Sequence, residues 1–85
     1  MKPYLFENGA EEDLAEALAY YRRESETLAG RLYDEINRLI VEICATLHLY
    51  RVVASPVRRH FSEIFPFAVL YVEKPDHIAI LAVAH

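Results

Sequence analysis

The second half of the sequence contains one adjacent pair of basic residues, Arg58 and Arg59, which His60 follows directly. A guanidinium group can donate two hydrogen bonds to a phosphate or carboxylate, and a histidine titrates near neutral pH. These three residues are therefore the candidates for catalysis and for contact with an anionic partner. Alternatively, an arginine on a strand pairs with a helix acid such as Glu35 or Glu42. Because consecutive strand residues face opposite ways, we expect one arginine to reach solvent and its neighbour to lie over the helix side.

Metal, thiol and cofactor chemistry find little support in the sequence. The histidines are far apart, and no pair of cysteines accompanies them, so we expect no metal site. They are His48, His60, His77 and His85. Cys44 lies on the apolar stripe of a predicted helix, which is typical of a buried cysteine rather than a nucleophile. With two glycines the chain cannot form a Gly-rich phosphate loop, and we expect no cofactor.

Four carboxylates near the N-terminus suggest acid–base chemistry at first sight. They are Glu11, Glu12, Asp13 and Glu16. Their position at the start of a predicted helix, where the helix dipole favours negative charge, instead indicates a solvated helix start.

Length and charge restrict the class of protein. With 85 residues we expect a single domain, residues 1–85. The net charge is −4, but residues 1–50 carry 5 bases and 10 acids, whereas residues 51–85 carry 4 bases and 3 acids. This acidic balance argues against a general electrostatic grip on nucleic acid. No apolar run is long enough to span a membrane or to form a signal peptide, and one cysteine fits a reducing cytoplasm.

Hydrophobic periodicity predicts an α+β domain. Helical spacing indicates a first helix over residues 10–23, with Asn8 as its N-cap, and a second helix capped by Ser25 or Thr27. The apolar stripe of the second helix is Leu28, Leu32, Ile36, Leu39, Ile43 and Leu47, widened by Ile40 and Cys44. We expect Gly30 to allow close contact between the two helices. The predicted strands cover residues 2–6, 57–64, 67–73 and 78–83. The order is thus βααβββ: an N-terminal strand, an αα-hairpin and a three-strand antiparallel meander, with both helices on one sheet face.

The last two predicted strands are apolar on both faces. Phe67, Val69 and Tyr71 point one way, while the residues between them point the other. Two helices cover one face of a small sheet, so the other face is either covered by something else or exposed as a binding surface. The sequence leaves both alternatives open.

Several stretches, in this order, resemble the RelE/ParE superfamily of type II toxin–antitoxin toxins. Residues 10–21, AEEDLAEALAYY, resemble the first helix of that family, and residues 28–36, LAGRLYDEI, resemble the start of its second helix. Residues 57–71, VRRHFSEIFPFAVLY, are similar to its VRR…FPYxVxY signature, and residues 79–85, AILAVAH, to its last strand. The resemblance covers nearly the whole chain and implies the same α+β fold.

The resemblance implies two possible targets. RelE-like members are ribosome-dependent mRNA endoribonucleases that use basic sheet residues and a C-terminal arginine and tyrosine, whereas ParE-like members inhibit DNA gyrase without a nuclease site. Arg59 could occupy one basic position, but Ala68 stands where the nucleases have an arginine, and no basic or aromatic residues follow His85. This pattern favours a non-enzymatic, ParE-like plasmid-stabilisation toxin. A nuclease, or an inactive homologue that still binds antitoxin, remains the alternative.

In this family an antitoxin segment wraps the toxin, so the resemblance implies a cognate antitoxin as partner, DNA gyrase as target, no membrane contact, and nucleic acid only through a target complex. The residues expected to bind the partner come from the basic pair and the apolar strands. They are Arg58, Arg59, Phe67, Val69, Tyr71, Ile80 and His85.

Overall fold

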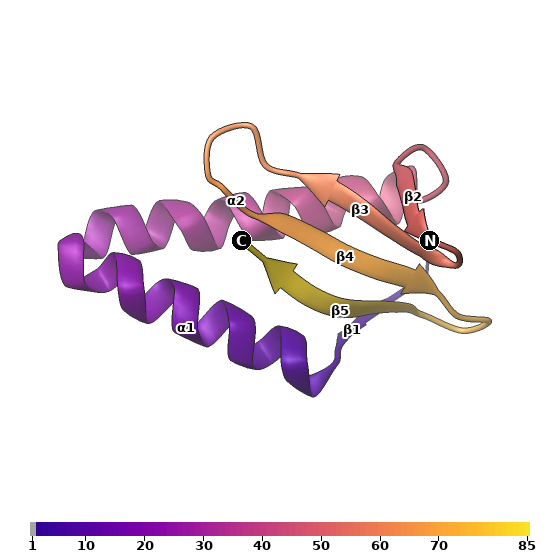
Figure 1. The fold of residues 1–85 in the computed structure, drawn as a ribbon, viewed down its shortest axis with the longest axis horizontal. Coiled ribbons are helices and arrows are strands. Elements are labelled where there is room, and N and C mark those ends of the chain that lie inside the picture. The colour runs from indigo at the N-terminus through magenta and orange to yellow at the C-terminus, as the bar shows by residue number, and fades with distance from the viewer. Residues whose placement is uncertain (1) are drawn as a thin grey trace.

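The computed structural model describes residues 2–85 and contains a five-stranded sheet with two helices packed on one of its faces (Figure 1). In chain order the elements are β1 (Tyr4–Phe6), α1 (Asn8–Glu24), α2 (Glu26–Ala45), β2 (Arg51–Ala54), β3 (Val57–Phe61), β4 (Ala68–Glu73) and β5 (Ile78–Ala84). The strand order across the sheet is β1-β5-β4-β3-β2. The predicted α+β class and the antiparallel meander of β3, β4 and β5 are confirmed.

The sheet contains one strand more than the sequence predicted. The segment after Tyr50 was expected to be a loop, and this expectation is wrong, because β2 pairs antiparallel with β3. Val52 and Val53 give β2 the β-branched side chains that suit a strand, and Ser55 and Pro56 form the turn that follows. At the opposite edge β1 lies parallel to β5, so the first strand of the chain pairs with the last.

One residue ends the first helix and begins the second. The backbone N–H of Ser25 donates to the carbonyl oxygen of Tyr21 at 2.9 Å, and its hydroxyl accepts from the N–H of Leu28 at 3.1 Å. The predicted Ser25 cap is therefore confirmed, and it turns α1 back along α2 with an extended residue at the corner. The expected Asn8 cap is wrong: α1 already includes Asn8, and its N-cap position is Glu7, which makes no side-chain cap.

The contact expected at Gly30 is also absent. A methyl group placed on Gly30 would meet no atom within 4 Å, so the two helices do not approach each other closely there.

The core lies between the helices and one face of the sheet. The predicted apolar stripe of α2 is buried in its middle part, where Leu32, Ile36, Leu39 and Ile43 are at most 1% exposed. At its ends, Leu28 is half-buried, and Leu47 lies beyond the end of α2 at Ala45. From the sheet, β4 and β5 contribute large side chains that are also fully buried, namely Val69, Tyr71, Ile78 and Ile80. Among residues 2–85 no helix is long and apolar enough to cross a membrane.

The other face of the sheet carries no second layer of residues 2–85 (Figure 1). Ala68 and Ala79 are still buried on it, because small methyl groups lie low between longer neighbours. Leu70 remains half-buried on this face, and Phe61 is 55% exposed. The sequence left open whether this face is covered or exposed, and within residues 2–85 it is exposed.

A buried hydroxyl ties the sheet to the end of α2. Tyr71 is fully buried, and its Oη donates to the carbonyl oxygen of Leu47 at 2.6 Å. Burial raises the pKa of Tyr71 to about 12, so the hydroxyl keeps the proton that it donates.

We expect the substitution Tyr71→Phe to leave the Leu47 carbonyl without its partner in a buried setting. The free energy of unfolding should fall by about 1–3 kcal/mol, the usual cost of such a loss. Urea denaturation followed by circular dichroism measures it. Tyr33→Phe is the matched control, because the Tyr33 side chain is exposed, and a surface change of this kind should alter stability by no more than about 0.5 kcal/mol. Equal stability of the two variants would contradict the role given to the Tyr71 hydroxyl.

Candidate functional site

Strand alternation separates the three candidate residues of β3. Arg58 lies opposite Tyr71 of β4, so its side chain points to the helix-covered face. His60, two residues on, points to the same face. Arg59 lies opposite Leu70 and points to the open face. The predicted division of the two arginines between faces is confirmed, and the three side chains do not converge on one site.

Arg58 holds the chain that enters β2. Its Nη1 donates to the carbonyl oxygens of Tyr50 at 2.7 Å and His48 at 3.3 Å. Both carbonyls belong to the segment between α2 and β2, where no regular helix or strand satisfies them. The guanidinium therefore stabilises this connection against β3 and has fewer donors left for an outside ligand.

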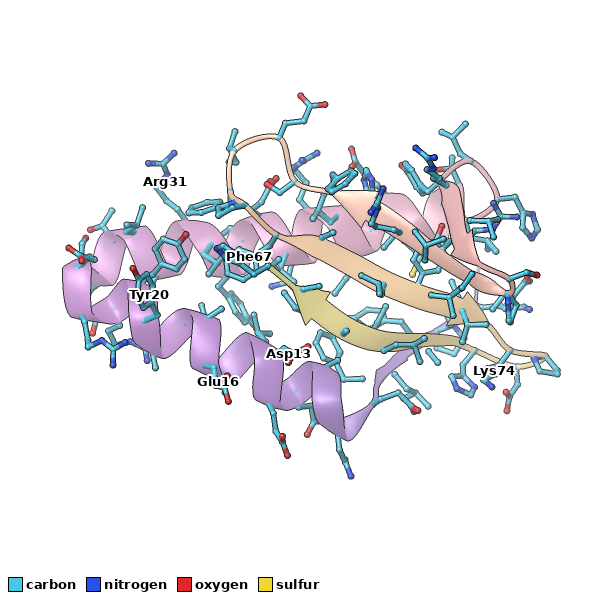
Figure 2. All side chains as sticks on the ribbon, viewed as in Figure 1. Asp13, Glu16, Tyr20, Arg31, Phe67 and Lys74 are labelled. Atoms are coloured by element: carbon cyan, nitrogen blue, oxygen red, sulfur yellow. The ribbon has the colours of Figure 1, made fainter. Side chains whose placement is uncertain are left out.

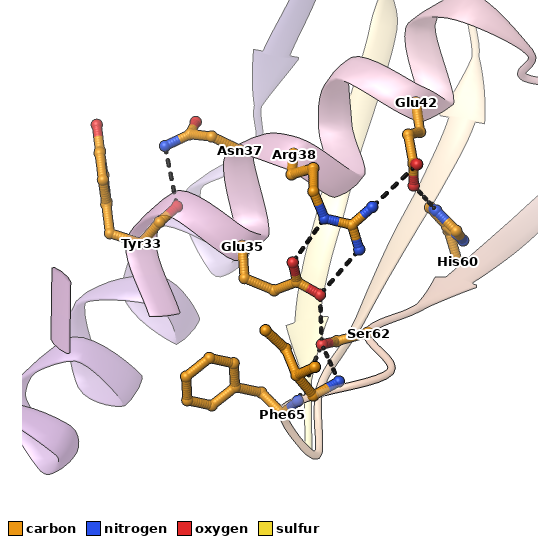
Figure 3. Close-up of polar contacts among 9 residues, drawn as sticks. Tyr33, Glu35, Asn37, Arg38, Glu42, His60, Ser62 and Phe65 are labelled. Atoms are coloured by element: carbon orange, nitrogen blue, oxygen red, sulfur yellow. Dashed lines mark hydrogen bonds and ion pairs between the residues drawn. The ribbon is translucent and has the colours of Figure 1, made fainter. Parts of the chain in front are cut away.

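Polar side chains of α2 and of the region around β3 form one continuous set of contacts, which we call the Glu35–His60 network (Figure 3). Its members are Glu35, Arg38, Glu42, His60 and Ser62. Arg38 donates to both carboxylate oxygens of Glu35, from Nε at 2.7 Å and Nη2 at 3.0 Å, and from Nη1 to Glu42 at 2.9 Å. The hydroxyl of Ser62 donates to Glu35 at 2.6 Å, and Nε2 of His60 lies 2.8 Å from Glu42.

The network keeps both carboxylates in their charged form. The hydrogen bond from Arg38 lowers the pKa of Glu35 against the opposing effect of burial, and Ser62 adds to it. The hydrogen bond with His60 lowers the pKa of Glu42, and the charge of Arg38 adds to it. A carboxylate held in this way is a poor proton acceptor, so neither acid suits general-base catalysis.

The arginines of β3 do not pair with Glu35 or Glu42, so that expectation is wrong. Arg38 comes from α2 itself and occupies both acids, and the strand contributes His60 instead. The ring of His60 also stacks on Tyr50, with centroids 3.8 Å apart and planes 22° apart. The network thus clamps β3 and the loop after it onto α2.

Ser62 extends this clamp into the loop between β3 and β4. Its Oγ accepts hydrogen bonds from the backbone N–H groups of Ile64 at 3.1 Å and Phe65 at 3.0 Å. The same oxygen donates to Glu35, so one hydroxyl orders the loop and joins it to the helix.

The open face presents two arginines side by side. Arg51 of β2 lies directly opposite Arg59 of β3 in the strand register. The guanidinium of Arg59 lies over the ring of Phe61, 4.2 Å from its centroid. Next to them is a pocket of about 430 Å³ between β3, β4 and the end of β5. Arg59, Phe61, Leu70 and Ala84 are among the residues that line it.

An acid of α1 covers the edge of β5. Beyond Ile80, β5 has no paired strand on the β1 side, and the N–H of Val83 donates to Oδ2 of Asp13 at 3.0 Å. Figure 2 shows Asp13 on α1, facing the end of the sheet, with Phe67 nearby in the view. The sequence predicts a solvated helix start at Asp13 and its neighbours, and for Asp13 this prediction is wrong, because its carboxylate accepts a hydrogen bond from β5.

Four of the residues expected to bind a partner lie inside the protein. Val69, Tyr71 and Ile80 are fully buried beneath the helices, and Phe67 is 9% exposed. They face the core because the helices pack on their side of the sheet, so that expectation is corrected. Of the expected partner-binding residues, Arg59, Phe67 and His85 line the open-face pocket.

Residues 2–85 bring no three potential metal ligands together. Each of three histidines contacts one acid instead: His48 contacts Glu73 at 2.9 Å, His60 contacts Glu42 and His77 contacts Asp76 at 2.8 Å. Cys44 is buried, as expected, and burial raises the pKa of its thiol, which disfavours the reactive thiolate.

We expect Arg38→Met to lower the free energy of unfolding at neutral pH by about 1–3 kcal/mol, because the carboxylate of Glu35 loses its charged donor while remaining buried. Asp34→Asn is the control, since Asp34 is the adjacent acid of α2 and is exposed. Urea denaturation of both variants measures the effect. A loss no greater than that of the control would contradict the clamp.

The lowered pKa of Glu35 also predicts a pH dependence. A carboxyl whose pKa is lower in the folded state contributes stability above its unfolded pKa, and this contribution is lost as the pH falls through the folded-state pKa. Wild-type protein should therefore lose more stability on acidification from neutral pH to about pH 3 than Glu35→Gln does. Urea denaturation at a series of pH values tests this. Parallel curves for the two proteins would show that Glu35 makes no such contribution.

Comparison with known proteins finds a similar fold among solved structures. No family model matches the sequence, and no curated protein sequence matches it. Among solved structures, it is similar to a chain described as the chromosomal ParDE TA system from P. aeruginosa, with a TM-score of 0.78. The likeness covers 100% of this chain and 96% of that chain, and the two are 17% identical. At that identity the likeness establishes a shared fold over the whole length described.

Proposed function

We propose that this chain is the toxin of a type II toxin–antitoxin module, ParE-like in its action. The observation that carries the proposal is the shared fold with a chain of a ParDE toxin–antitoxin system over 100% of this sequence. The stretch Val57–Tyr71, which resembles the family signature, lies on β3, the following loop and β4. Fold and local sequence therefore support the same proposal independently.

DNA gyrase is the proposed target, and no nuclease chemistry is assigned. In-line cleavage of RNA needs preorganised cations around one reacting phosphate. Arg58 is bound to backbone carbonyls and His60 to Glu42, whereas Arg59 points to the opposite face of the sheet. Ala68 gives no charge where the nucleases have an arginine. The three candidate cations are divided between the two sheet faces, and two of them are held by contacts within the fold, which supports the non-enzymatic branch.

A cognate antitoxin is the proposed partner, and the cytoplasm is the proposed place of action. The uncovered sheet face, with half-buried Leu70 and exposed Phe61, supports a protein partner that covers it. The buried, unpaired Cys44 fits a reducing compartment.

Expression of the chain in a bacterium, without its partner, should arrest growth and cause gyrase-dependent DNA damage. With purified components, the chain should inhibit supercoiling of relaxed plasmid by DNA gyrase in proportion to its concentration. Ile80→Asp is the control, since an unpaired carboxylate in the core should unfold the protein and abolish inhibition. Unchanged supercoiling in the presence of a large excess of folded chain would contradict the gyrase target.

The alternatives give different results in the same host. A ribosome-dependent nuclease would leave supercoiling unchanged, cut mRNA at codon positions, and lose toxicity in Arg59→Ala. An inactive homologue would permit normal growth while binding tightly to the product of a neighbouring gene. Either result would replace the gyrase proposal.

A further inference from the structure

We propose that the open sheet face around Arg59 binds a protein segment in which an acidic side chain is flanked by apolar ones. The pocket of about 430 Å³ on this face has walls from β3, β4, the loop between them and the end of β5. Phe61, Leu70 and Ala84 supply apolar surface to it, and Phe61 is 55% exposed. Surface of this kind accepts aliphatic or aromatic side chains.

The charged group in this pocket, the guanidinium of Arg59, lies over the Phe61 ring but has no acidic partner among residues 2–85. Arg59 is half-buried, and its Nε is shielded from solvent without any hydrogen-bond partner in the described chain. None of the ion pairs among residues 2–85 includes Arg59. A half-buried guanidinium with no acid beside it leaves its charge uncompensated, and a carboxylate that approaches from the open face would compensate this charge by a charge-assisted hydrogen bond to the accessible part of the group.

A second arginine, on the neighbouring strand β2, adds to the positive charge around Arg59. Arg51 lies directly opposite Arg59, and like charges in that position repel each other. Arg51 also takes part in none of the ion pairs of residues 2–85, although the sequence has 13 acids for 9 bases. The two guanidinium groups together make a positive spot on a face that is otherwise apolar.

This combination favours a protein segment over a nucleic acid. Binding along a phosphate backbone depends on several cations, and the protein as a whole carries a net charge of −4. Two arginines beside apolar walls match one carboxylate between apolar side chains. The chemistry of the segment is inferred from this face alone, and that the antitoxin supplies it rests on the proposed function.

The test uses the purified full chain, labelled with ¹⁵N, and two short blocked peptides, Leu-Glu-Leu-Phe and Leu-Gln-Leu-Phe. The glutamate peptide should shift the amide resonances of Phe61, Leu70 and Ala84. It should bind about tenfold more tightly than the glutamine peptide, as expected for one charge-assisted hydrogen bond. Equal affinities, no shifts at these residues, or shifts elsewhere only would overturn the proposal.

Variants separate the site from general charge effects. Arg59→Gln should abolish the preference for the glutamate peptide, whereas Arg31→Gln should retain it, because Arg31 projects from α2 away from this face (Figure 2). Arg51→Thr is the second variant. It should reduce the preference without lowering the urea midpoint, since it removes the repulsion between the two arginines. A preference for the glutamate peptide that persists in Arg59→Gln would overturn the proposal, and so would an unchanged preference in Arg51→Thr.

A single-stranded oligothymidine of similar size is the competing probe. It should bind more weakly than the glutamate peptide at the same salt concentration. Tighter binding of the oligonucleotide at the same residues would overturn the proposal and assign the face to nucleic acid. Because the growth and gyrase assays are separate, failure of peptide binding is distinguishable from failure of the proposed toxin activity.

Discussion

Two helices cover only one face of the five-stranded sheet, and this limit determines what each charged side chain of β3 does. On the covered side, Arg58 and His60 meet α2 and the segment that follows it, and both find partners there. On the open side, Arg59 lies over the ring of Phe61 and opposite another arginine in the strand register, and no ion pair among residues 2–85 includes it. The same short run of sequence therefore stabilises the fold with some of its charges and leaves one charge available.

The covered side shows how a small domain can bury a carboxylate. Glu35 is 5% exposed, and burial alone would favour its neutral form. Two donors from Arg38 and one from Ser62 reverse this preference, and Ser62 also orders the loop before β4. Such a network contributes more to a unique arrangement than to total stability, because desolvation offsets much of the attraction between its charges. It fixes where the loop between β3 and β4 lies against α2.

The sequence predicted those features whose signals are local. The stripe of α2 from Leu32 to Ile43 and the Ser25 cap each depend on spacing within one element, and both are confirmed. The Asn8 cap is a local prediction that was wrong, because α1 already includes Asn8. The face of the sheet on which the helices pack depends on tertiary arrangement, so Val69 and Tyr71 were expected at a surface although they lie in the core. Strand β2 was missed because a two-residue turn with proline obscured a short pair of strands.

Some contacts of the candidate site have a local sequence signal, and others depend on the tertiary arrangement. Glu35, Arg38 and Glu42 are three and four residues apart on a helix, a spacing that already places them on one side, so this part of the network was open to sequence reasoning. Other contacts join residues that are distant in sequence. His60 contacts Glu42 and stacks on Tyr50, and the carboxylate of Asp13 accepts a hydrogen bond from β5. No periodicity in a single sequence encodes such pairs.

The arginines of this chain differ in how fully the fold satisfies them. Arg38 has two acids and Arg58 has two carbonyl oxygens, so each contributes to the folded state through contacts that the chain itself supplies. Arg51 and Arg59 stand opposite each other, an arrangement that costs stability, and the described chain offers no acid to offset it. When residues are arranged in a way that lowers stability and no other contact offsets the loss, the arrangement usually serves function. The open face is therefore the part of this molecule where two charged side chains have no acidic partner within the described chain.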